Sequence, residues 1–208
     1  MTLLSAHGIG FDYPARPLFS NWSHAFQPGL TWLEGRNGYG KSTLLRLLGG
    51  ALDPTTGQRV IGNVDASTQP LAYRRQVFWC APDCIAFDHL KPPEYWGFMG
   101  SLYPSFQADQ VPTLADALDL APFLGKRISA LSSGTQKKVA VLAALAAHTP
   151  VVLMDEPLAA LDQNAVVVLR TCLAEATVQT TQTWVVTSHE PLGDAEFAAH
   201  RLALAAPG

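Results

Sequence analysis

A glycine-rich segment, residues 35–43, carries the clearest chemical signal in this 208-residue chain. It reads GRNGYGKST and fits G-x-x-x-x-G-K-[ST], the pattern of a phosphate-binding loop. Glycines let the backbone fold into a tight concave loop, so that successive N–H groups point at one phosphate group. Lys41 places a positive charge at the β- and γ-phosphates, and the Ser42 hydroxyl is a suitable Mg²⁺ ligand. The segment therefore predicts binding of a nucleoside triphosphate with Mg²⁺.

Two adjacent carboxylates, Asp155 and Glu156, form the second candidate site. They follow Val151–Met154, an uninterrupted apolar run typical of a strand buried on both faces. Asp155 can hold Mg²⁺ through its hydration shell, while Glu156 can orient and deprotonate an attacking water. The alternative is a helix cap followed by a solvated acid. In a chain that already has a phosphate-binding loop, the pair predicts hydrolysis of the triphosphate.

Three further side chains stand where predicted elements begin or end. His189 follows the predicted strand Thr183–Thr187 and can donate a hydrogen bond to a γ-phosphate oxygen, although a lone histidine is usually structural. Ser132 opens the alanine-rich helix Lys137–Ala147 and could form an anion site, although an ordinary helix cap is the simpler explanation. Tyr13, at a strand end, can stack on a purine, with core packing as the alternative.

These residues require a sheet whose strands end at one edge. Apolar runs and alternations predict strands at Leu3–Phe11, Phe19–Phe26, Gly29–Glu34, Gln58–Ile61, Val77–Ala81, Val151–Met154 and Thr183–Thr187. Helices are predicted at Ser42–Leu48, Lys137–Ala147 and Gln163–Ala176, with others starting near Pro92 and Leu114. This order predicts a single α/β domain (1–208) with a parallel sheet and catalytic groups at the carboxyl ends of its strands. The core is 1–83 and 149–208, and a helical lobe, about 84–148, is inserted in it.

Composition limits the range of partners. Apolar residues make up 48% of the chain and charged residues 15%, with a net charge of −3, so bulk electrostatics do not favour nucleic acid. No apolar run approaches the roughly 18 residues of a membrane span, and the start has no signal-peptide pattern. Three cysteines, Cys80, Cys84 and Cys172, form an odd, sparse set in a nucleotide-binding chain, which predicts reduced cytosolic thiols. A Cys-x-x-x-Cys metal site is not expected, because no second ligand pair accompanies it.

Together with Leu131–Thr135 (LSSGT) and Leu161-Asp162, these motifs resemble the nucleotide-binding subunit of an ABC transporter. The resemblance covers essentially the whole chain, and the motifs stand in the family's order. It implies an ABC-type P-loop NTPase: an α/β fold with a mostly parallel core sheet, an N-terminal antiparallel β region and an inserted helical lobe. It also implies an ATP hydrolase that uses ATP and Mg²⁺.

The resemblance assigns roles to individual residues. Residues implied to contact ATP are Tyr13, Gly35, Arg36, Asn37, Gly38, Tyr39, Gly40, Lys41, Ser42, Thr43, Ser132, Gly134 and Asp162, although Arg36 and Tyr39 are at positions that vary in the family. Residues implied to be catalytic are Glu156, His189 and Lys41. Residues implied to hold Mg²⁺ are Ser42, Asp155 and Asp83. Three residues depart from the family's pattern: Asp83 and Thr135 each stand where the family has glutamine, and Ser133 stands where it has glycine. Because a carboxylate cannot donate a hydrogen bond as an amide does, hydrolysis or its coupling to a partner is expected to be tuned differently.

The resemblance also implies partners. Two copies, or one copy and a homologous ATPase subunit, would sandwich two ATP molecules head to tail, each lending Ser132 to the other's nucleotide. A separate integral-membrane permease would dock near Asp83–Trp96, which places the chain in the cytoplasm, peripheral on the inner face of the membrane, without nucleic acid. Chain length and the stretch from Glu94-Tyr95 to Leu102-Tyr103 are similar to exporter-type members. The C-terminus after His189 is similar, more narrowly, to the haem exporter subunit of cytochrome c maturation. The alternatives are a soluble ABC ATPase acting on a cytosolic assembly complex, and a catalytically weak nucleotide-binding module, which only Asp83 favours.

Overall fold

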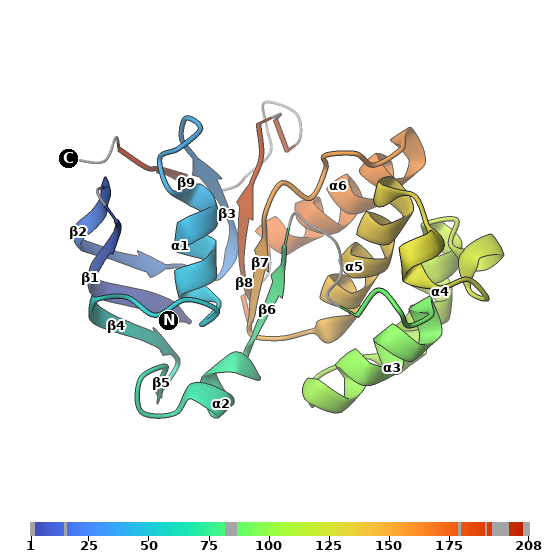
Figure 1. Cartoon of the computed structure of the whole chain (residues 1–208), viewed down its shortest axis with the longest axis horizontal. Helices are drawn as coiled ribbons and strands as arrows, with labels where there is room; N and C mark the ends of the chain where they lie inside the picture. The colour runs from blue at the N-terminus through green and yellow to red at the C-terminus, as the bar shows by residue number, and fades with distance from the viewer. Residues whose placement is uncertain are drawn as a thin grey trace.

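Two β-sheets and a group of helices make up the protein (Figure 1). The computed structural model describes residues 3–14, 16–81, 87–178, 180–189, 191–192 and 200–205. The strands are β1 (Leu4–Tyr13), β2 (Arg16–Phe26), β3 (Gly29–Glu34), β4 (Thr56–Ile61), β5 (Val64–Asp65), β6 (Val77–Cys80), β7 (Val151–Met154), β8 (Thr183–Thr187) and β9 (His200–Ala203). The α-helices are α1 (Lys41–Leu48), α2 (Pro70–Arg74), α3 (Pro92–Leu102), α4 (Val111–Ala117), α5 (Ser133–Ala147) and α6 (Gln163–Thr177).

The two sheets differ in strand direction, as the sequence predicted. The first has the order β2-β1-β4-β5 and is antiparallel, and the second has the order β6-β7-β8-β3-β9 and is parallel. In a parallel sheet all carboxyl ends lie at one edge, so β3, β7 and β8 deliver their following residues to the same place. This edge carries the phosphate-binding loop, the two carboxylates and His189.

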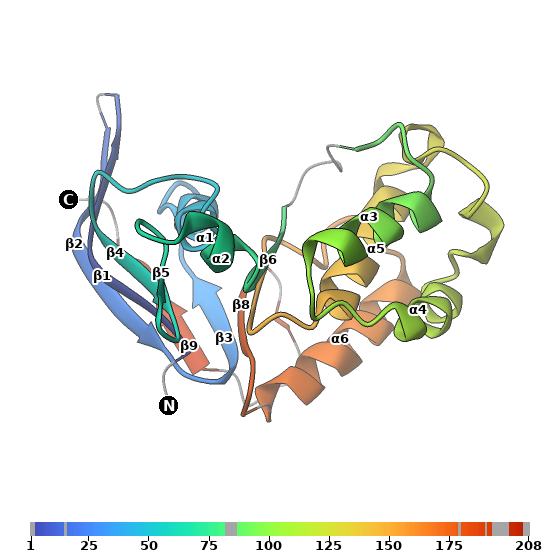
Figure 2. The same cartoon turned by 90° about the horizontal axis from the view of Figure 1, so that it is seen from below.

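Helix α1 fills the space between the two sheets (Figure 2). Its leucines, Leu44, Leu45, Leu47 and Leu48, are fully buried. They share one apolar cluster with residues of the antiparallel sheet, such as Ile9, and of the parallel sheet, such as Leu153. Burying four leucines stabilises the fold by roughly 1.5–3 kcal/mol for each side chain. The packing fixes the axis of α1 and therefore the direction in which its N-terminus points.

The helical region packs on the opposite face of the parallel sheet. One apolar cluster contains Phe78 of β6 and Met154 of β7 together with Trp96 of α3 and Val139 of α5. Core and helical lobe thus share a continuous apolar interior, and the lobe boundaries near residues 84 and 148 stay a prediction. Among the described residues no helix is long and apolar enough to cross a membrane.

Several elements differ from the sequence-based prediction. Helix α4 spans Val111–Ala117 and begins before the predicted start near Leu114, because Pro112 in its first turn has the backbone angle that starts a helix. Strand β2 begins at Arg16 rather than Phe19, since the hairpin continues to the register pair Tyr13↔Arg16. Elements α2, β5 and β9 were not predicted, because they are two to five residues long and have no clear apolar period.

Buried Arg59 ties β4 to the C-terminal end of α1. Its side chain donates hydrogen bonds to the carbonyls of Leu47 and Leu52, both at 2.7 Å, and to the Asp53 carboxylate at 2.8 Å, with 4% of the residue exposed. Helix C-termini leave carbonyl groups without intrahelical partners, and this guanidinium donates to one of them, Leu47, and to Leu52 in the segment after the helix. Arg59 therefore stabilises the end of the helix that follows the phosphate-binding loop.

Replacement of Arg59 by Met should lower the free energy of unfolding by about 2–4 kcal/mol, because the hydrogen bonds from the guanidinium to the Leu47 and Leu52 carbonyls are lost. Urea denaturation monitored by tryptophan fluorescence measures the change. Asp53→Asn is the matched control, since it removes only the exposed partner and should cost at most about 1 kcal/mol. Equal losses in the two variants would contradict the assignment.

Candidate nucleotide site

The phosphate-binding loop lies between β3 and α1, at the carboxyl edge of the parallel sheet. Gly38 and Gly40 have φ values of 83° and 93°, a left-handed region that favours glycine. The Lys41 ammonium donates a hydrogen bond of 2.6 Å to the Gly35 carbonyl, so the lysine folds back across the loop. No acidic residue stands in the first turn of α1, and the partial positive charge of the helix N-terminus is uncompensated there. An anion is favoured at this position.

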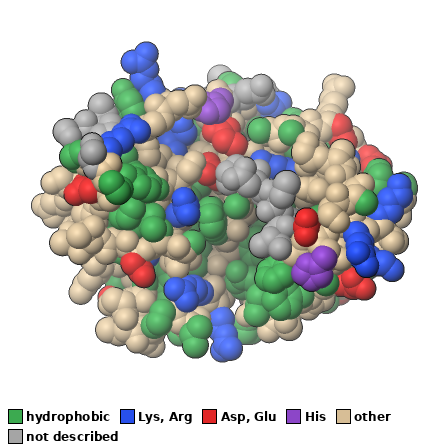
Figure 3. All heavy atoms as spheres, in the orientation of Figure 1, with side chains coloured by type: hydrophobic (Ala, Val, Ile, Leu, Met, Phe, Trp, Pro, Cys, Tyr) green, Lys and Arg blue, Asp and Glu red, His purple; other side chains and the backbone are tan. Residues whose placement is uncertain are grey.

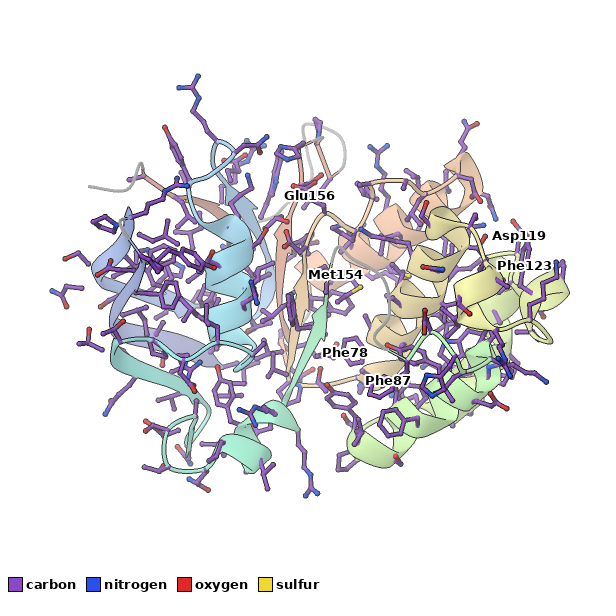
Figure 4. All side chains as sticks on the ribbon, viewed as in Figure 1. Phe78, Phe87, Asp119, Phe123, Met154 and Glu156 are labelled. Carbon is purple, nitrogen blue, oxygen red and sulfur yellow. The ribbon has the colours of Figure 1, made fainter. Side chains whose placement is uncertain are left out.

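A cavity of about 230 Å³ opens beside this loop. It brings together four segments of the chain: the β1–β2 hairpin, the phosphate-binding loop, the end of β7 and the end of β8. Its lining residues are Tyr13, Arg16, Leu18, Asn37, Gly38, Gly40, Lys41, Ser42, Thr43, Asp155, Glu156 and His189. In Figure 3, acidic, basic and histidine side chains gather at the upper part of the visible face, over the region where Figure 4 labels Glu156.

Asp155 is a buried carboxylate with one oxygen available for a cation. The residue is 2% exposed, and its Oδ1 accepts a hydrogen bond of 2.7 Å from the Thr187 hydroxyl. Its Oδ2 is buried and has no hydrogen-bond partner among the described residues. A buried carboxylate oxygen without a partner is costly unless a cation or water completes it. Asp155 and Ser42 line the same cavity, so this pair fits the oxygen ligands that Mg²⁺ prefers.

Glu156 points into the cavity from an unusual backbone conformation. Its φ is 49°, and its N–H donates to the Thr187 hydroxyl at 2.9 Å. The backbone N–H of His189 donates to Oε2 at 3.1 Å, and His189 Nε2 lies 3.4 Å from Oε1. Figure 4 shows Glu156 beyond Met154, at the upper end of β7. A carboxylate held beside a histidine in the phosphate cavity suits a general base.

The hairpin places an aromatic ring and a guanidinium over the loop. Tyr13 and Arg16 are register partners across β1 and β2. The Tyr13 hydroxyl lies 3.3 Å from the Thr43 hydroxyl, and the Tyr13 ring packs edge-on against Phe11 with centroids 5.0 Å apart. Arg16 donates a hydrogen bond of 2.6 Å to the Gly38 carbonyl. The sequence analysis assigned Arg16 no role, since nothing in the local pattern shows that the hairpin folds onto the loop.

Arg16→Ala should weaken ATP binding about tenfold while kcat changes less than threefold, because one cation beside the phosphates is lost and the catalytic carboxylates stay in place. Equilibrium binding of a fluorescent ATP analogue and steady-state hydrolysis measure the two quantities. The exposed Arg75, outside the cavity, provides the matched control Arg75→Ala. Wild-type affinity in Arg16→Ala would exclude Arg16 from the site.

Several predicted residues lie outside this cavity. Gly35, Arg36 and Tyr39 belong to the phosphate-binding loop but do not line the cavity. Ser132, Gly134 and Asp162, in other parts of the chain, do not line the cavity either. The Ser132 hydroxyl caps α5 by accepting a hydrogen bond of 3.2 Å from the Thr135 N–H. Asp162 caps α6 and pairs with Lys138 at 2.5 Å, and these bonds hold the pKa of its carboxyl below the ordinary value. Asp83 and Cys84 are outside the described residues.

Thr187 is the second residue that the sequence analysis missed. It is fully buried at the end of β8 and contacts both Asp155 and the Glu156 backbone. Its position directly before Ser188-His189 was the available signal. Cys80 is the last residue of β6, and its backbone carbonyl accepts a hydrogen bond from the Asp155 N–H. Burial raises the pKa of the Cys80 thiol to about 11. This thiol is therefore protonated at neutral pH and chemically inert.

Comparison with known proteins gives the family. A sequence model described as ABC transporter matches residues 20–159, which include the loop, the helix cap at Ser132 and both carboxylates. The chain belongs to the ABC transporter family. It is an ATP-binding subunit of that family, an ATPase whose hydrolysis is coupled to transport.

Relatives of this ABC subunit come from several bacteria. It is 33% identical over 175 residues to the cytochrome c biogenesis ATP-binding export protein CcmA of Pseudomonas syringae pv. syringae, covering 83% of this chain and 81% of the relative. The CcmA protein of Pseudomonas putida KT2440 is 31% identical over 194 residues, with 92% of each chain covered. The sulfate/thiosulfate import protein CysA of Brucella melitensis is 34% identical over 192 residues, but only 53% of that relative is covered.

Solved structures share the fold of this ABC subunit. An ATP-binding subunit of an ABC transporter superimposes with a TM-score of 0.82 and 24% identity, covering 90% of this chain and 80% of the other. A dimeric ATP-binding cassette bound to ADP and Pi has a TM-score of 0.74 and 22% identity, with 90% and 88% covered. The predicted α/β P-loop fold is confirmed.

Proposed function

We propose that two copies of this chain bind two Mg-ATP molecules between them and that hydrolysis drives a separate membrane permease, in the direction of export. The cavity supports this proposal, because it contains a phosphate loop, two carboxylates and a histidine from one chain but neither Ser132 nor Gly134. Those two residues stand at the N-terminus of α5, where N–H groups and the helix dipole favour an anion. A second copy, related by two-fold symmetry, would bring that helix end to the nucleotide.

Different residues of the chain have different roles in ATP binding and hydrolysis. Lys41 and the N–H groups of the loop would bind the β- and γ-phosphates, and Ser42 and Asp155 would hold Mg²⁺, which would neutralise phosphate charge. Glu156 accepts a proton from the attacking water at its carboxylate, and His189 keeps that carboxylate oriented through its backbone N–H. Tyr13 stacks on the base at the hairpin. We also propose that Asp83 contributes to the Mg²⁺ site and that Asp162, before α6, contacts ATP.

Export is proposed from the relatives. Both CcmA proteins align over most of their length, whereas the import protein CysA is covered over about half. By this likeness, we place the chain on the cytoplasmic face of a membrane, beside an integral-membrane subunit. The competing function is a soluble ABC ATPase that acts on a cytosolic assembly.

Fractionation of cells that express the tagged full-length chain tests this proposal. The chain should sediment with membranes, should co-purify in detergent with a polytopic protein, and should hydrolyse ATP several-fold faster when the two are reconstituted in vesicles. A chain found only in the soluble fraction, bound to soluble proteins that stimulate it, would establish the competing function.

A further inference from the structure

Two neighbouring lysines near the start of α5, the helix that Ser132 caps, are buried. Lys137 and Lys138 are 9% and 6% exposed, and both side chains cross to residues 156–162, the turn between β7 and α6. The Lys137 ammonium donates a hydrogen bond of 2.7 Å to the Glu156 carbonyl. The Lys138 ammonium pairs with Asp162 at the other end of the turn. The start of α5 therefore contacts both ends of the segment that begins with the proposed general base.

The middle of the turn also lies against α5. A Cβ atom added to Gly134 would be 2.6 Å from the Ala160 carbonyl oxygen, closer than any side chain tolerates. Only glycine permits this approach of helix and turn. Three contacts along seven residues thus join the turn to the first part of α5.

The turn needs such support because its backbone is strained. Glu156 and Ala160 have φ values of 49° and 62°, in the left-handed region that costs a residue with a Cβ roughly 1–2 kcal/mol. Strain of this kind persists only where surrounding contacts hold it, and it is common at active sites. At Glu156 the N–H donates to the Thr187 hydroxyl, and the carbonyl accepts from Lys137 at 2.7 Å and from the Ala159 N–H at 3.2 Å, so both peptide groups of the residue are fixed.

Burial of the Lys137 ammonium at this position costs free energy. Within the described part of the chain, Lys137 forms no ion pair, and the Glu156 carbonyl is the hydrogen-bond acceptor found for its ammonium. Burying a charged group without a countercharge is unfavourable, and an apolar side chain would pack here without that penalty. The hydrogen bond to the Glu156 carbonyl is the specific interaction that the buried ammonium makes.

We propose that Lys137 is a positioning residue for hydrolysis: it holds the Glu156 backbone in the left-handed conformation that aims the carboxylate into the phosphate cavity. The same bond ties the chain's own general base to the helix whose cap, Ser132, serves the partner's nucleotide, a consequence that rests on the proposed two-chain site. Lys137 itself does not line the cavity and acts through Glu156.

The variant Lys137→Met tests this role in the full-length protein, with Lys137→Arg as the conservative variant. We expect kcat for ATP to fall about ten- to a hundredfold while KM stays within about twofold, because misplacing a catalytic group by 1 Å has effects of this size. Lys137→Arg should recover most of the loss. Lys126→Met is the matched control, since Lys126 is exposed on the helical lobe over the Phe123 ring, and it should leave kcat unchanged.

Hydrogen exchange of the nucleotide-free protein gives a second readout that does not depend on activity. Amides of residues 158–161 should exchange at least about tenfold faster in Lys137→Met and at the wild-type rate in Lys126→Met. In a Glu156→Gln background, Lys137→Met should cause no further loss of the residual rate, because both changes act on the same group. Unchanged kcat in Lys137→Met, unchanged exchange, or losses that add in the double variant would each overturn the proposal.

The two-chain proposal and the positioning role of Lys137 can be tested separately. If Glu156→Gln forms no ATP-dependent dimer, the proposed function is wrong, whatever Lys137→Met does to kcat. If that dimer forms and Lys137→Met nevertheless hydrolyses ATP at the wild-type rate, the positioning role alone is wrong.

Discussion

Glu156→Gln should lower kcat for ATP hydrolysis by about 10²–10⁴-fold, the contribution typical of a general base. Glutamine has the same shape, and its amide oxygen can still accept the His189 N–H, but it cannot take a proton from water. The bonds from Lys137 and to Thr187 involve the backbone of residue 156 and are retained. The loss is therefore chemical rather than structural.

Single-turnover hydrolysis of radiolabelled ATP measures this loss, and gel filtration with Mg-ATP shows whether the variant retains nucleotide as a dimer. We expect ATP to be retained, since Glu156 supplies none of the phosphate-binding groups. Glu175→Gln, an exposed carboxylate on α6, is the matched control. Turnover by Glu156→Gln within twofold of wild type would remove Glu156 from the role of base.

Ser132→Asp should abolish most hydrolysis, by about 10²-fold, and leave the fold intact. Aspartate is as good an N-cap as serine and can accept the same bond from the Thr135 N–H. It also introduces a negative charge where the partner's γ-phosphate would approach, in a site where like charges repel strongly. Affinity of the monomer for ATP should not change, because Ser132 does not line the cavity of its own chain.

Thermal unfolding, ATP binding under dilute conditions and hydrolysis at high protein concentration separate these effects. Ser20→Asp, on an exposed position of β2, controls for the added charge. Hydrolysis by Ser132→Asp at the wild-type rate would show that the start of α5 has no contact with phosphate. A loss of monomer affinity as large as the loss of hydrolysis would place Ser132 in its own chain's site instead.

The elements that carry the site were predictable because their signals are local. Strands β3 and β8 have the predicted bounds, since each is a short run of apolar residues that ends at a polar or glycine residue. Helices α5 and α6 begin at residues whose side chains cap them, and both were predicted within a few residues. The carboxyl ends of parallel strands then had to meet, which placed Lys41 near Asp155 without any knowledge of distances.

Residues that act across the fold were not predictable in the same way. Arg16 reaches Gly38 only because the β1–β2 hairpin folds over the loop, and Lys137 reaches Glu156 only because α5 crosses the end of β7. Both lysines of α5 look like solvated charges in the sequence, yet both are buried. Strand β9 was missed because its residues are mostly exposed and lack an apolar run. Tertiary contact, rather than local pattern, assigns these residues.

Mixing two inactive variants, Glu156→Gln and Ser132→Asp, tests most directly whether one site needs two chains. In a head-to-tail dimer of the two, one site carries both changes, and the other combines a normal Glu156 with a normal Ser132. Random pairing of equal amounts should therefore restore ATP hydrolysis to about a quarter of the wild-type rate, since half of the dimers gain one intact site of two. If each chain forms its site alone, the mixture will hydrolyse ATP no faster than the mean of the separate variants, and the two-chain account is contradicted.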